Sequence, residues 1–385
     1  MTPGARASAA IAVLDRIAAG EAAERALTNW ARAARYAGSG DRAAVRDLVF
    51  DALRRWRSSA ALGGGETGRA RLIGLLRGQG ADPAGLFTGA GHAPPPLTPA
   101  EAAPPRPLEA LEALDCPDWL APQLQASLGA DFAPVMAALR DRAPVFLRVN
   151  AARIGRDDAA GRLAAEGILA VPDPLAPWAL RVTGGARSIA ASAAYAAGLV
   201  ELQDGASQAV VAALDPAPGL AVLDFCAGGG GKALALAACG AAVTAHDAAP
   251  GRMRDLPARA ARAGATIATA PPFRPGGWPL VLADAPCSGS GAWRRQPEAR
   301  LRLTPAALAA LTATQDGVLD AAAGHVAPGG RLAYATCSLL GVENADRIAA
   351  FIGRHPGWRI AQTRRWTPLD GGDGFYLAVL IAPGG

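Results

Sequence analysis

A short apolar run and four consecutive glycines make up the stretch Ala221-Val-Leu-Asp-Phe-Cys-Ala-Gly-Gly-Gly-Gly-Lys232. The apolar run has the length of a buried strand, and helix-forming residues follow the glycines from Ala233 to Cys239. Glycines between a strand and a helix let backbone amides approach a ligand at the helix N-terminus. The stretch therefore predicts the first strand, ligand loop and helix of a parallel α/β sheet.

Further apolar runs follow at the spacing that strand-helix-strand units require. They are Ala242-Val-Thr-Ala245, Leu280-Val-Leu-Ala283 and Arg331-Leu-Ala-Tyr334. We therefore predict a doubly wound, Rossmann-like α/β domain over residues 201–385.

Three regions are predicted to precede this domain. Residues 1–92 form an all-helical domain, in which one helix buries Val45, Leu48, Val49, Leu53 and Trp56 and turns Arg46, Arg54 and Arg55 towards solvent or RNA. Residues 93–107 are rich in Pro and Ala, so we expect a linker that cannot hold a helix. Residues 108–200 alternate short helices with strand-like runs, which predicts a small α+β module.

Positive charge is concentrated at the N-terminus. Residues 1–77 hold thirteen arginines and seven acidic residues, while the whole chain has a net charge of +5. A basic domain joined to a near-neutral one suits an enzyme with a polyanionic substrate, although a solvated helix surface has the same composition. Lys232 is the sole lysine among 38 basic residues, which makes it a candidate for a site that needs a compact ammonium group.

The numbers and spacing of cysteines and histidines indicate whether the chain holds a metal site or disulfide bonds. The chain has four histidines and five cysteines, with no C-x-x-C pair, so we predict neither a metal site nor a disulfide framework. We find no signal-peptide core and no run of eighteen apolar residues, so we expect no membrane association. The expected protein is cytoplasmic and monomeric.

The glycine loop leaves two cofactor classes open. A P-loop is disfavoured because Cys226 and Ala233 stand where glycine and Ser or Thr would be required. The spacing Gly228-x-Gly230-x-x-Ala233, with Asp247 at the end of the next run, suits a nicotinamide dinucleotide or S-adenosylmethionine (SAM). In either case Asp247 would bind ribose hydroxyls.

Two cysteines bear on this choice. Cys287 lies in Asp284-Ala-Pro-Cys-Ser-Gly-Ser-Gly291, and Cys337 lies in Tyr334-Ala-Thr-Cys-Ser338. Each follows a predicted strand, and the carboxyl ends of parallel strands meet at one edge, so both thiols are expected at one site. Hydride transfer has no need of two thiols, whereas C5 of a pyrimidine becomes nucleophilic once a thiolate adds to C6. Asp284 is then placed to act as the acid near N3 of the base, and SAM is the favoured cofactor.

From about residue 117 to residue 385 the chain resembles the RNA cytosine-5 methyltransferases of the Sun/RsmB type. The shared motifs are, in chain order, Leu147-Arg-Val-Asn150, Gln203-Asp-Gly-Ala-Ser-Gln208, the glycine loop, Asp284 to Gly291, Arg294-Arg-Gln-Pro297, Pro328-Gly-Gly-Arg331, Thr336-Cys-Ser338 with Glu343-Asn344, and Asp373-Gly-Phe375.

The resemblance implies roles for individual residues. Cys337 would be the nucleophile and Cys287 would aid product release, although DNA cytosine methyltransferases assign attack to the Pro-Cys position, which leaves reversed roles open. Asp284 would orient the base and also contact the cofactor. The family's SAM loop maps onto Cys226, Ala227, Gly228, Gly229, Gly230, Gly231 and Lys232, with Asp247 for the ribose.

The chain departs from the family pattern at two places. Gly228 and Gly229 replace Ala and Pro, which implies a looser loop and weaker SAM binding. An Asp that the family places near the adenine has no counterpart in residues 265–272.

The N-terminal helices resemble the NusB-like RNA-binding domain of RsmB enzymes, which favours ribosomal RNA over tRNA. Trp293 is expected to stack on a base, and Arg294 and Arg295, with Arg300 and Arg302, are expected to contact phosphates. A buried tryptophan beside a solvated arginine face is the alternative. We expect a SAM-dependent cytosine-C5 methyltransferase of small-subunit rRNA; the alternatives are a tRNA methyltransferase, a weakly catalytic ribosome assembly factor and a nicotinamide-dependent oxidoreductase.

Overall fold

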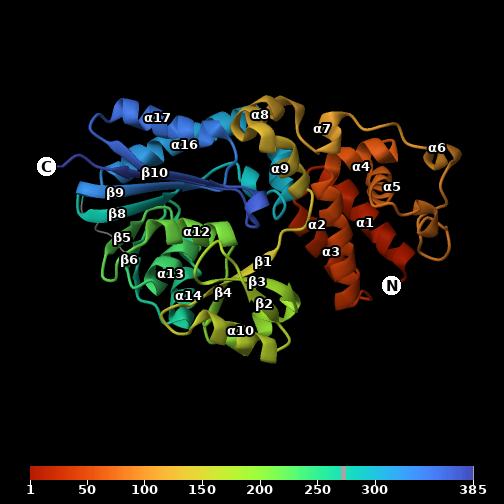
Figure 1. The fold of residues 1–385 in the computed structure, drawn as a ribbon. Coiled ribbons are helices and arrows are strands. Elements are labelled where there is room, and N and C mark those ends of the chain that lie inside the picture. Colours follow the sequence, from red (N-terminus) through yellow and green to blue (C-terminus); the bar gives the residue numbers. More distant parts are fainter. Residues whose placement is uncertain (270–274, 385) are drawn as a thin grey trace. The chain divides into compact units, whose positions relative to one another are not determined.

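The computed structural model describes residues 1–269 and 275–384 (Figure 1). The chain divides into two compact units. The first consists of Met1–Arg142 together with Trp293–Arg302, and the second of Ala143–Ala292 together with Leu303–Gly385. A ten-residue segment of the C-terminal half thus belongs to the N-terminal unit.

The first unit is helical, as predicted. A cluster of alanine, valine, leucine and isoleucine side chains from α1, α2, α3 and α5 forms its core, with Leu14, Leu53 and Ile73 fully buried. Its helices are α1 (Pro3–Ala18), α2 (Ala23–Ala33), α3 (Ser39–Arg54), α4 (Trp56–Gly63), α5 (Gly68–Gly78), α6 (Pro99–Ala102), α7 (Ala110–Ala113), α8 (Ala121–Leu128), α9 (Phe132–Ala138) and α15 (Pro297–Arg302).

The predicted linker contains one helical turn, α6, which corrects the expectation that residues 93–107 hold no helix. Pro99 occupies the first turn, where its missing N–H has no partner to lose. Thr98 and Glu101 form a capping box, and Glu101 also pairs with Arg69 at 2.7 Å. The linker is therefore fastened to α5.

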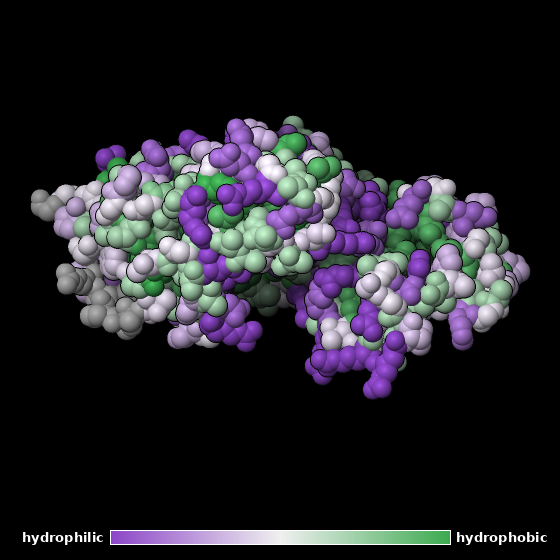
Figure 2. Space-filling model, turned by 90° about the horizontal axis from the view of Figure 1, so that it is seen from below, coloured by the Kyte–Doolittle hydropathy of each residue, from purple (hydrophilic) through white to green (hydrophobic). Residues whose placement is uncertain are grey.

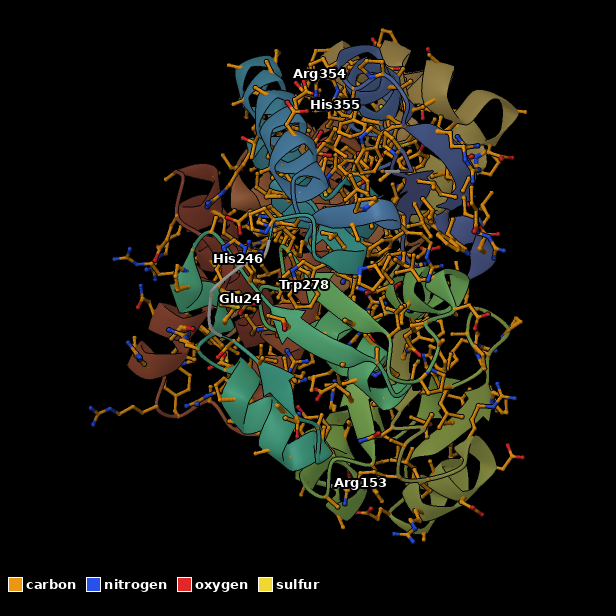
Figure 3. The ribbon with its side chains drawn as sticks, turned by 90° about the vertical axis from the view of Figure 1, so that its left-hand side faces the viewer. Glu24, Arg153, His246, Trp278, Arg354 and His355 are labelled. Atoms are coloured by element: carbon orange, nitrogen blue, oxygen red, sulfur yellow. The ribbon has the colours of Figure 1, made fainter. Side chains whose placement is uncertain are left out.

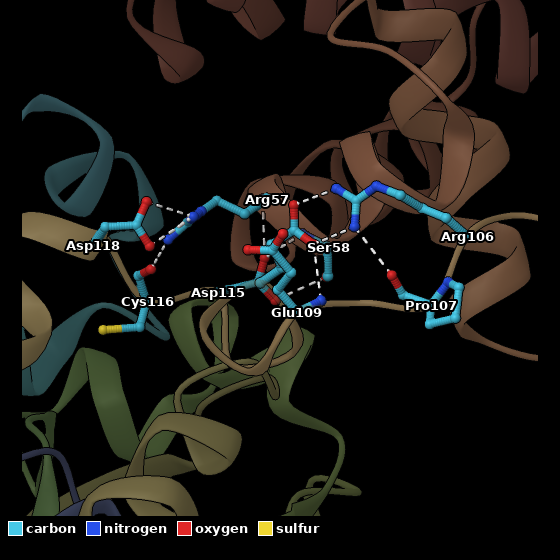
Figure 4. Close-up of polar contacts among 9 residues, drawn as sticks. Arg57, Ser58, Arg106, Pro107, Glu109, Asp115, Cys116 and Asp118 are labelled. Atoms are coloured by element: carbon cyan, nitrogen blue, oxygen red, sulfur yellow. Dashed lines mark hydrogen bonds and ion pairs between the residues drawn. The ribbon is translucent and has the colours of Figure 1, made fainter.

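The residues that follow the linker are tied to the start of α4 (Figure 4). Asp115 is 1% exposed and accepts hydrogen bonds from the amides of Arg57 and Ser58, both at 2.9 Å. Arg57 pairs in turn with Asp118 at 2.8 Å. Since the first amides of a helix have no partner within it, Asp115 caps α4 from a distant part of the chain.

The segment Trp293–Arg302 packs within the first unit through buried arginines. Arg300 donates to the carbonyls of Leu53 (3.3 Å) and Arg54 (2.6 Å) at the end of α3, and Arg54 Nε donates to the carbonyl of Arg294 at 2.8 Å. Arg54 is 7% exposed, which corrects the prediction that it faces solvent or RNA. The guanidinium group of Arg300 thus satisfies carbonyls that the end of α3 leaves unpaired.

The second unit begins with an antiparallel sheet in the order β2-β3-β1-β4. Its core contains Leu147, Leu163 and Leu180, all fully buried. The elements are β1 (Val145–Val149), α10 (Arg156–Ala165), β2 (Leu169–Pro172), β3 (Ala179–Gly184), α11 (Ala193–Ala196) and β4 (Val200–Leu202).

A seven-stranded sheet follows in the order β10-β11-β9-β8-β5-β6-β7. Strands β5, β6, β7, β8 and β9 run parallel to one another, and β11 is antiparallel to both β9 and β10. The strand order reverses between β5 and β8, which is where ligands bind in doubly wound sheets. The elements are α12 (Gly205–Leu214), β5 (Ala221–Asp224), α13 (Gly231–Ala238), β6 (Ala242–Ala245), α14 (Leu256–Ala263), β7 (Ile267–Ala268), β8 (Trp278–Asp284), α16 (Pro305–Ala323), β9 (Val326–Thr336), α17 (Ala345–Arg354), β10 (Arg359–Trp366) and β11 (Phe375–Ile381).

Helices cover both faces of this sheet (Figure 1). Alternate residues of the central strands face opposite layers: Val222 packs in the core with α12 and α13, whereas Leu223 packs in the core with α16 and α17. A strand buried on both faces must be apolar throughout, which is why short apolar runs marked these strands in the sequence. The predicted Rossmann-like α/β fold is confirmed.

The compact units do not coincide with the predicted domain boundaries. Helices α8 and α9 fall in the first unit, although residues 108–200 were predicted to form one module. The predicted boundaries at residues 92, 107 and 200, and the likeness of the first unit to NusB, remain predictions.

Hydrophilic and hydrophobic side chains are interspersed on the face that Figure 2 shows. Large exposed apolar residues are scattered over the chain, with Tyr36, Leu169 and Ile360 each at least half exposed. None of the described helices has the length and apolar character needed to span a bilayer.

Candidate active site

The glycine loop connects β5 to α13 and takes backbone conformations that favour glycine. Gly228 and Gly230 have φ values of +49° and +80°, and a Cβ on Gly230 would lie 2.2 Å from Leu256 Cδ1. Asp247, 3% exposed, accepts hydrogen bonds from the amides of Gly228 and Ala249, each at 2.9 Å. The carboxylate that was predicted to bind ribose therefore also holds the loop.

Two arginines lie against the loop at the positions where the family pattern has Ala and Pro. Arg252 pairs with Asp247 at 3.1 Å, and a Cβ on Gly228 would lie 3.3 Å from Arg252 Nη2. Arg259 donates to the carbonyl of Gly229. Side chains thus restrain a loop that the sequence alone suggested to be loose; weaker SAM binding remains a prediction.

Lys232 extends from the start of α13 to the end of β8. Its Nζ lies 2.6 Å from Asp284 Oδ2 and 4.9 Å from the ring centroid of Phe375, the last residue of the Asp373-Gly-Phe375 motif. Lys232 is 7% exposed; burial alone would lower its pKa, but the contact with Asp284 outweighs burial and the pKa is raised. The sole lysine is therefore a buried ammonium group beside a carboxylate.

The two predicted thiols meet. Cys337 directly follows β9, Cys287 lies three residues beyond β8, and their Sγ atoms are 3.3 Å apart. The hydrogen bond with Cys337, together with burial, raises the pKa of Cys287 well above the usual range of a thiol. The two thiols thus share one hydrogen bond, in which either Sγ can be the donor.

The remaining thiols are less suited to chemistry. Burial raises the pKa of Cys226 to about 12, with the nearby negative charge of Asp224 adding to the effect, and burial raises the pKa of Cys116 to about 11. The pKa of Cys239 is also raised by burial. Thiols of this kind stay protonated at neutral pH and are poor nucleophiles.

Several site residues were not assigned roles from the sequence. Arg148 on β1, 4% exposed, donates to the Gln203 side chain and to the carbonyl of Gly231, both at 2.6 Å. Asn150 donates to the carbonyls of Gly198 (3.0 Å) and Ala263 (2.8 Å). These bonds fix the small sheet against the start of α13 and the end of α14, and their only sequence signal was the motif around residues 147–150.

The predicted RNA-contacting residues receive a mixed outcome. Trp293 is 0% exposed inside the first unit, so it cannot stack on a base in this conformation, and Arg294 and Arg300 are 5% and 3% exposed. The burial of these three side chains agrees with the alternative of a buried tryptophan, since the segment packs against α3, and their role in RNA binding remains a prediction. Arg295 and Arg302 retain accessible surface, and their role in RNA binding remains a prediction.

Other polar groups near the sheet edge have structural partners. His246, at the end of β6 (Figure 3), places Nδ1 2.9 Å from the carbonyl oxygen of Phe225.

Within residues 265–269 no carboxylate occurs, and residues 270–272 of the stretch that lacks the adenine-side Asp lie outside the described residues. Over the described residues, no group of three His, Cys, Asp or Glu side chains is placed to hold a metal ion.

The strand order, the glycine loop at the reversal point and the helix that follows it define the class of Rossmann-like methyltransferase domains. Sequence comparison identifies the particular family. A profile of the 16S rRNA methyltransferases RsmB/F matches residues 211–381, and one of the ferredoxin-like domain of RsmF/B-like methyltransferases matches residues 116–188.

Curated relatives agree with these profiles. Ribosomal RNA small subunit methyltransferase B of Salmonella arizonae is 34% identical over 283 residues, which are 69% of this chain and 66% of that protein. The protein of the same name from Xylella fastidiosa is 36% identical over 287 residues, 69% of this chain and 68% of that protein. The chain therefore spans about two thirds of the length of these relatives. It belongs to the RsmB/F family of SAM-dependent methyltransferases.

Solved structures support the fold. The crystal structure of PH0851 has a TM-score of 0.79 and 23% identity, covering 99% of each chain. The structure of NSun6 from Pyrococcus horikoshii with SFG has a TM-score of 0.61 and 18% identity, covering 69% of this chain and 98% of that chain.

The residues at the sheet edge fit SAM. Amides at the start of α13 suit a carboxylate, Asp247 suits ribose hydroxyls, and buried acids suit the positive charges of the cofactor. Asp224 is 0% exposed, and by the usual limits of distance and angle neither of its oxygens has a hydrogen-bond partner among the described residues. A buried acid of this kind suits a position beside a cationic ligand. The nicotinamide alternative is set aside, since the family uses SAM.

We expect Asp224 to make the stability of the free protein fall as the pH rises. Burial, reinforced by the charge of Asp284, raises the pKa of Asp224 to about 7, whereas the unfolded value is about 3.9. Between these values the folded state binds more protons than the unfolded state, so the free energy of unfolding decreases with pH and levels off above about 7, with a total loss on the order of 2–4 kcal/mol.

Thermal unfolding of wild type and Asp224→Asn without SAM, measured from pH 4.5 to 8, tests this expectation. The stability of the variant relative to wild type should increase up to about pH 7 and then stay constant. A difference that does not change with pH would contradict the assignment.

Proposed function

We propose that this protein transfers the methyl group of SAM to C5 of a cytosine in small-subunit ribosomal RNA through a covalent adduct with Cys337. The proposal rests on the Sγ atoms of Cys287 and Cys337, which lie 3.3 Å apart. The Lys232–Asp284 pair lies at the same edge of the sheet. The names of the relatives support ribosomal RNA as the substrate.

Cys337 begins the reaction as a thiolate. Its Sγ forms a bond to C6, the electron pair of the C5=C6 double bond moves onto C5 and is shared with N3 through C4, and C5 becomes nucleophilic. SAM, when bound, supplies a methyl group on an electrophilic sulfonium. Loss of the C5 proton to a base and cleavage of the C6–Sγ bond then restore the double bond, and the protonated Cys287 hydrogen-bonds to Cys337 Sγ as it departs.

Lys232 and Asp284 complement the base. The Watson–Crick edge of cytosine presents an acceptor at N3 beside a donor at the exocyclic amino group. The ammonium of Lys232 offers a donor and the carboxylate of Asp284 an acceptor, held 2.6 Å apart. In this arrangement Lys232 would donate to N3, the role that the sequence assigned to Asp284, and Asp284 would accept from the amino group. A proton or hydrogen bond at N3 favours addition at C6, and uracil, which carries a donor at N3 and an acceptor at C4, would need the pair in the reverse orientation.

The basic first unit supports an RNA substrate. Residues 1–77 carry an excess of six positive charges, and phosphate contacts supply affinity without sequence information. A NusB-like role for this unit in holding ribosomal RNA is part of the proposal.

Nucleoside mass spectrometry tests the proposed function. The protein and SAM are incubated with unmodified 16S rRNA and, in parallel, with unmodified tRNA, and SAM binding is measured by calorimetry. We expect new 5-methylcytidine in rRNA. Its formation in tRNA alone would change the substrate to tRNA, and its absence from both despite SAM binding would overturn the reaction in favour of an assembly factor.

A further inference from the structure

A single carboxylate joins the residues that follow the two thiols. Ser288 comes after Cys287 and Ser338 comes after Cys337, and both serine hydroxyls donate to Glu343 Oε2 at 2.5 Å. The amide of Ser288 also donates to Glu343 Oε1, at 2.8 Å. Loops that lie about fifty residues apart in the chain are thus connected beside their cysteines.

Glu343 is enclosed and its acceptor capacity is used. It is 0% exposed, and Gln315 Nε2 donates to Oε1 at 3.0 Å as a fourth hydrogen bond. All four partners are neutral donors, and hydrogen bonds to a carboxylate are shorter and stronger than those between neutral groups. The hydroxyl of Tyr334 on β9 donates to the main-chain carbonyl of Glu343 at 2.7 Å, which anchors the residue to the sheet.

Further bonds join the two loops, among them contacts of the Ser338 hydroxyl with the hydroxyls of Ser288 (3.4 Å) and Ser290 (3.1 Å). The amide of Gly291 donates to the carbonyl of Cys337 at 2.9 Å, and Ser290 Oγ accepts from the amide of Leu339 at 2.8 Å. These contacts set the separation of the two loops. The carboxylate is the one group that accepts from the residue directly after each of the two cysteines among these contacts.

We propose that Glu343 is a positioning residue that sets the approach of the Cys287 and Cys337 Sγ atoms. The inference rests on the proposed function only in taking these thiols as the reacting groups. Without the carboxylate, Ser288 and Ser338 lose their common acceptor and each thiol gains freedom to turn away. Misplacement of a reacting group by about 1 Å is enough to cost about a hundredfold in rate.

Disulfide trapping measures the thiol approach without RNA or SAM. Diamide takes two hydrogens from a pair of thiols, which form a disulfide while the diamide becomes a hydrazine. Mass spectrometry of non-reduced peptides then gives the rate of the Cys287–Cys337 linkage. We expect rapid linkage in wild type and linkage slowed at least about tenfold in Glu343→Ala and in the milder double variant Ser288→Ala/Ser338→Ala.

Two further variants separate positioning from general destabilisation. Glu343→Gln keeps an oxygen for the Ser288 amide and Gln315, and its amide group donates to serine hydroxyls that rotate to accept, so linkage should stay within a few-fold of wild type. Tyr334→Phe removes only the anchor on the main-chain carbonyl. It should lower the melting temperature and leave the linkage rate close to wild type.

Methylation kinetics give the second readout. Glu343→Ala should lower kcat by about a hundredfold with KM for RNA little changed, while Glu343→Gln restores most of kcat. Linkage as fast in folded Glu343→Ala and in the double serine variant as in wild type would overturn the positioning role. Slow linkage in these variants without methylation of any RNA by wild type would uphold the positioning role and overturn the proposed function instead.

Discussion

Replacing Cys337 with alanine is expected to lower methyl transfer at least about a thousandfold, because no other group supplies the nucleophile that activates C5. The Sγ atom of Cys337 lies at the end of β9, next to the pair formed by Lys232 and Asp284 at the end of β8. The variant should bind RNA and SAM as wild type does, and no protein–RNA adduct should survive denaturing electrophoresis.

Cys287→Ala is expected to behave differently. The thiol that supports departure of Cys337 is then absent, so the covalent RNA adduct should accumulate while product formation slows. Cys239→Ala is the matched control, because Cys239 ends α13 with its pKa raised by burial, and activity should be unchanged. An adduct that forms in Cys337→Ala and is lost in Cys287→Ala would reverse the roles of the two thiols.

Apolar periodicity predicted the large sheet well. The runs at residues 221–224 and 242–245 coincide with β5 and β6, because strands in the interior of a parallel sheet are made mostly of apolar residues. The meeting of Cys287 and Cys337 followed from the same logic, since Asp284 on β8 lies beside Ala335 on β9. Parallel strands bring their carboxyl ends to one edge whatever separates them in the chain.

The environment of the arginine side chains could not be predicted from the sequence in this way. Arg54 and Arg300 looked like RNA contacts but are buried, because a guanidinium group hydrogen-bonds to main-chain carbonyls as readily as to phosphate. The sequence also left open whether Trp293 stacks on a base or packs in a core, because its indole ring suits either environment. Which partner a long polar side chain takes depends on distant segments, and here the segment Trp293–Arg302 joins helices nearly 250 residues earlier.

The role of Glu343 also lay beyond local pattern. Its partner Ser288 is 55 residues away, and the Glu343-Asn344 pair entered only as part of a family motif. A buried carboxylate that accepts four hydrogen bonds has no signature in the residues around it. Its position becomes visible only when two loops fold onto it.

Lys232→Met is the second change expected to have a large effect. Methionine has a similar length and packs against Phe375, but it removes the ammonium that lies 2.6 Å from Asp284. Methylation at saturating SAM and RNA should fall about a hundredfold or more, since the donor to the cytosine edge is lost. Lys232→Arg should not restore the rate, because a planar guanidinium does not fit a buried space shaped for a compact ammonium.

Single-turnover rates separate a role in the reaction from a role in cofactor binding. If Lys232 only held SAM, the dissociation constant for SAM would rise in Lys232→Met and the rate at saturation would be unchanged. Asp284→Asn should also slow the saturated rate, and the double variant should lose much less than the two single losses combined, because the residues act as one pair. Additive losses would show that Lys232 and Asp284 act independently, and the pairing proposed for the cytosine edge would then be wrong.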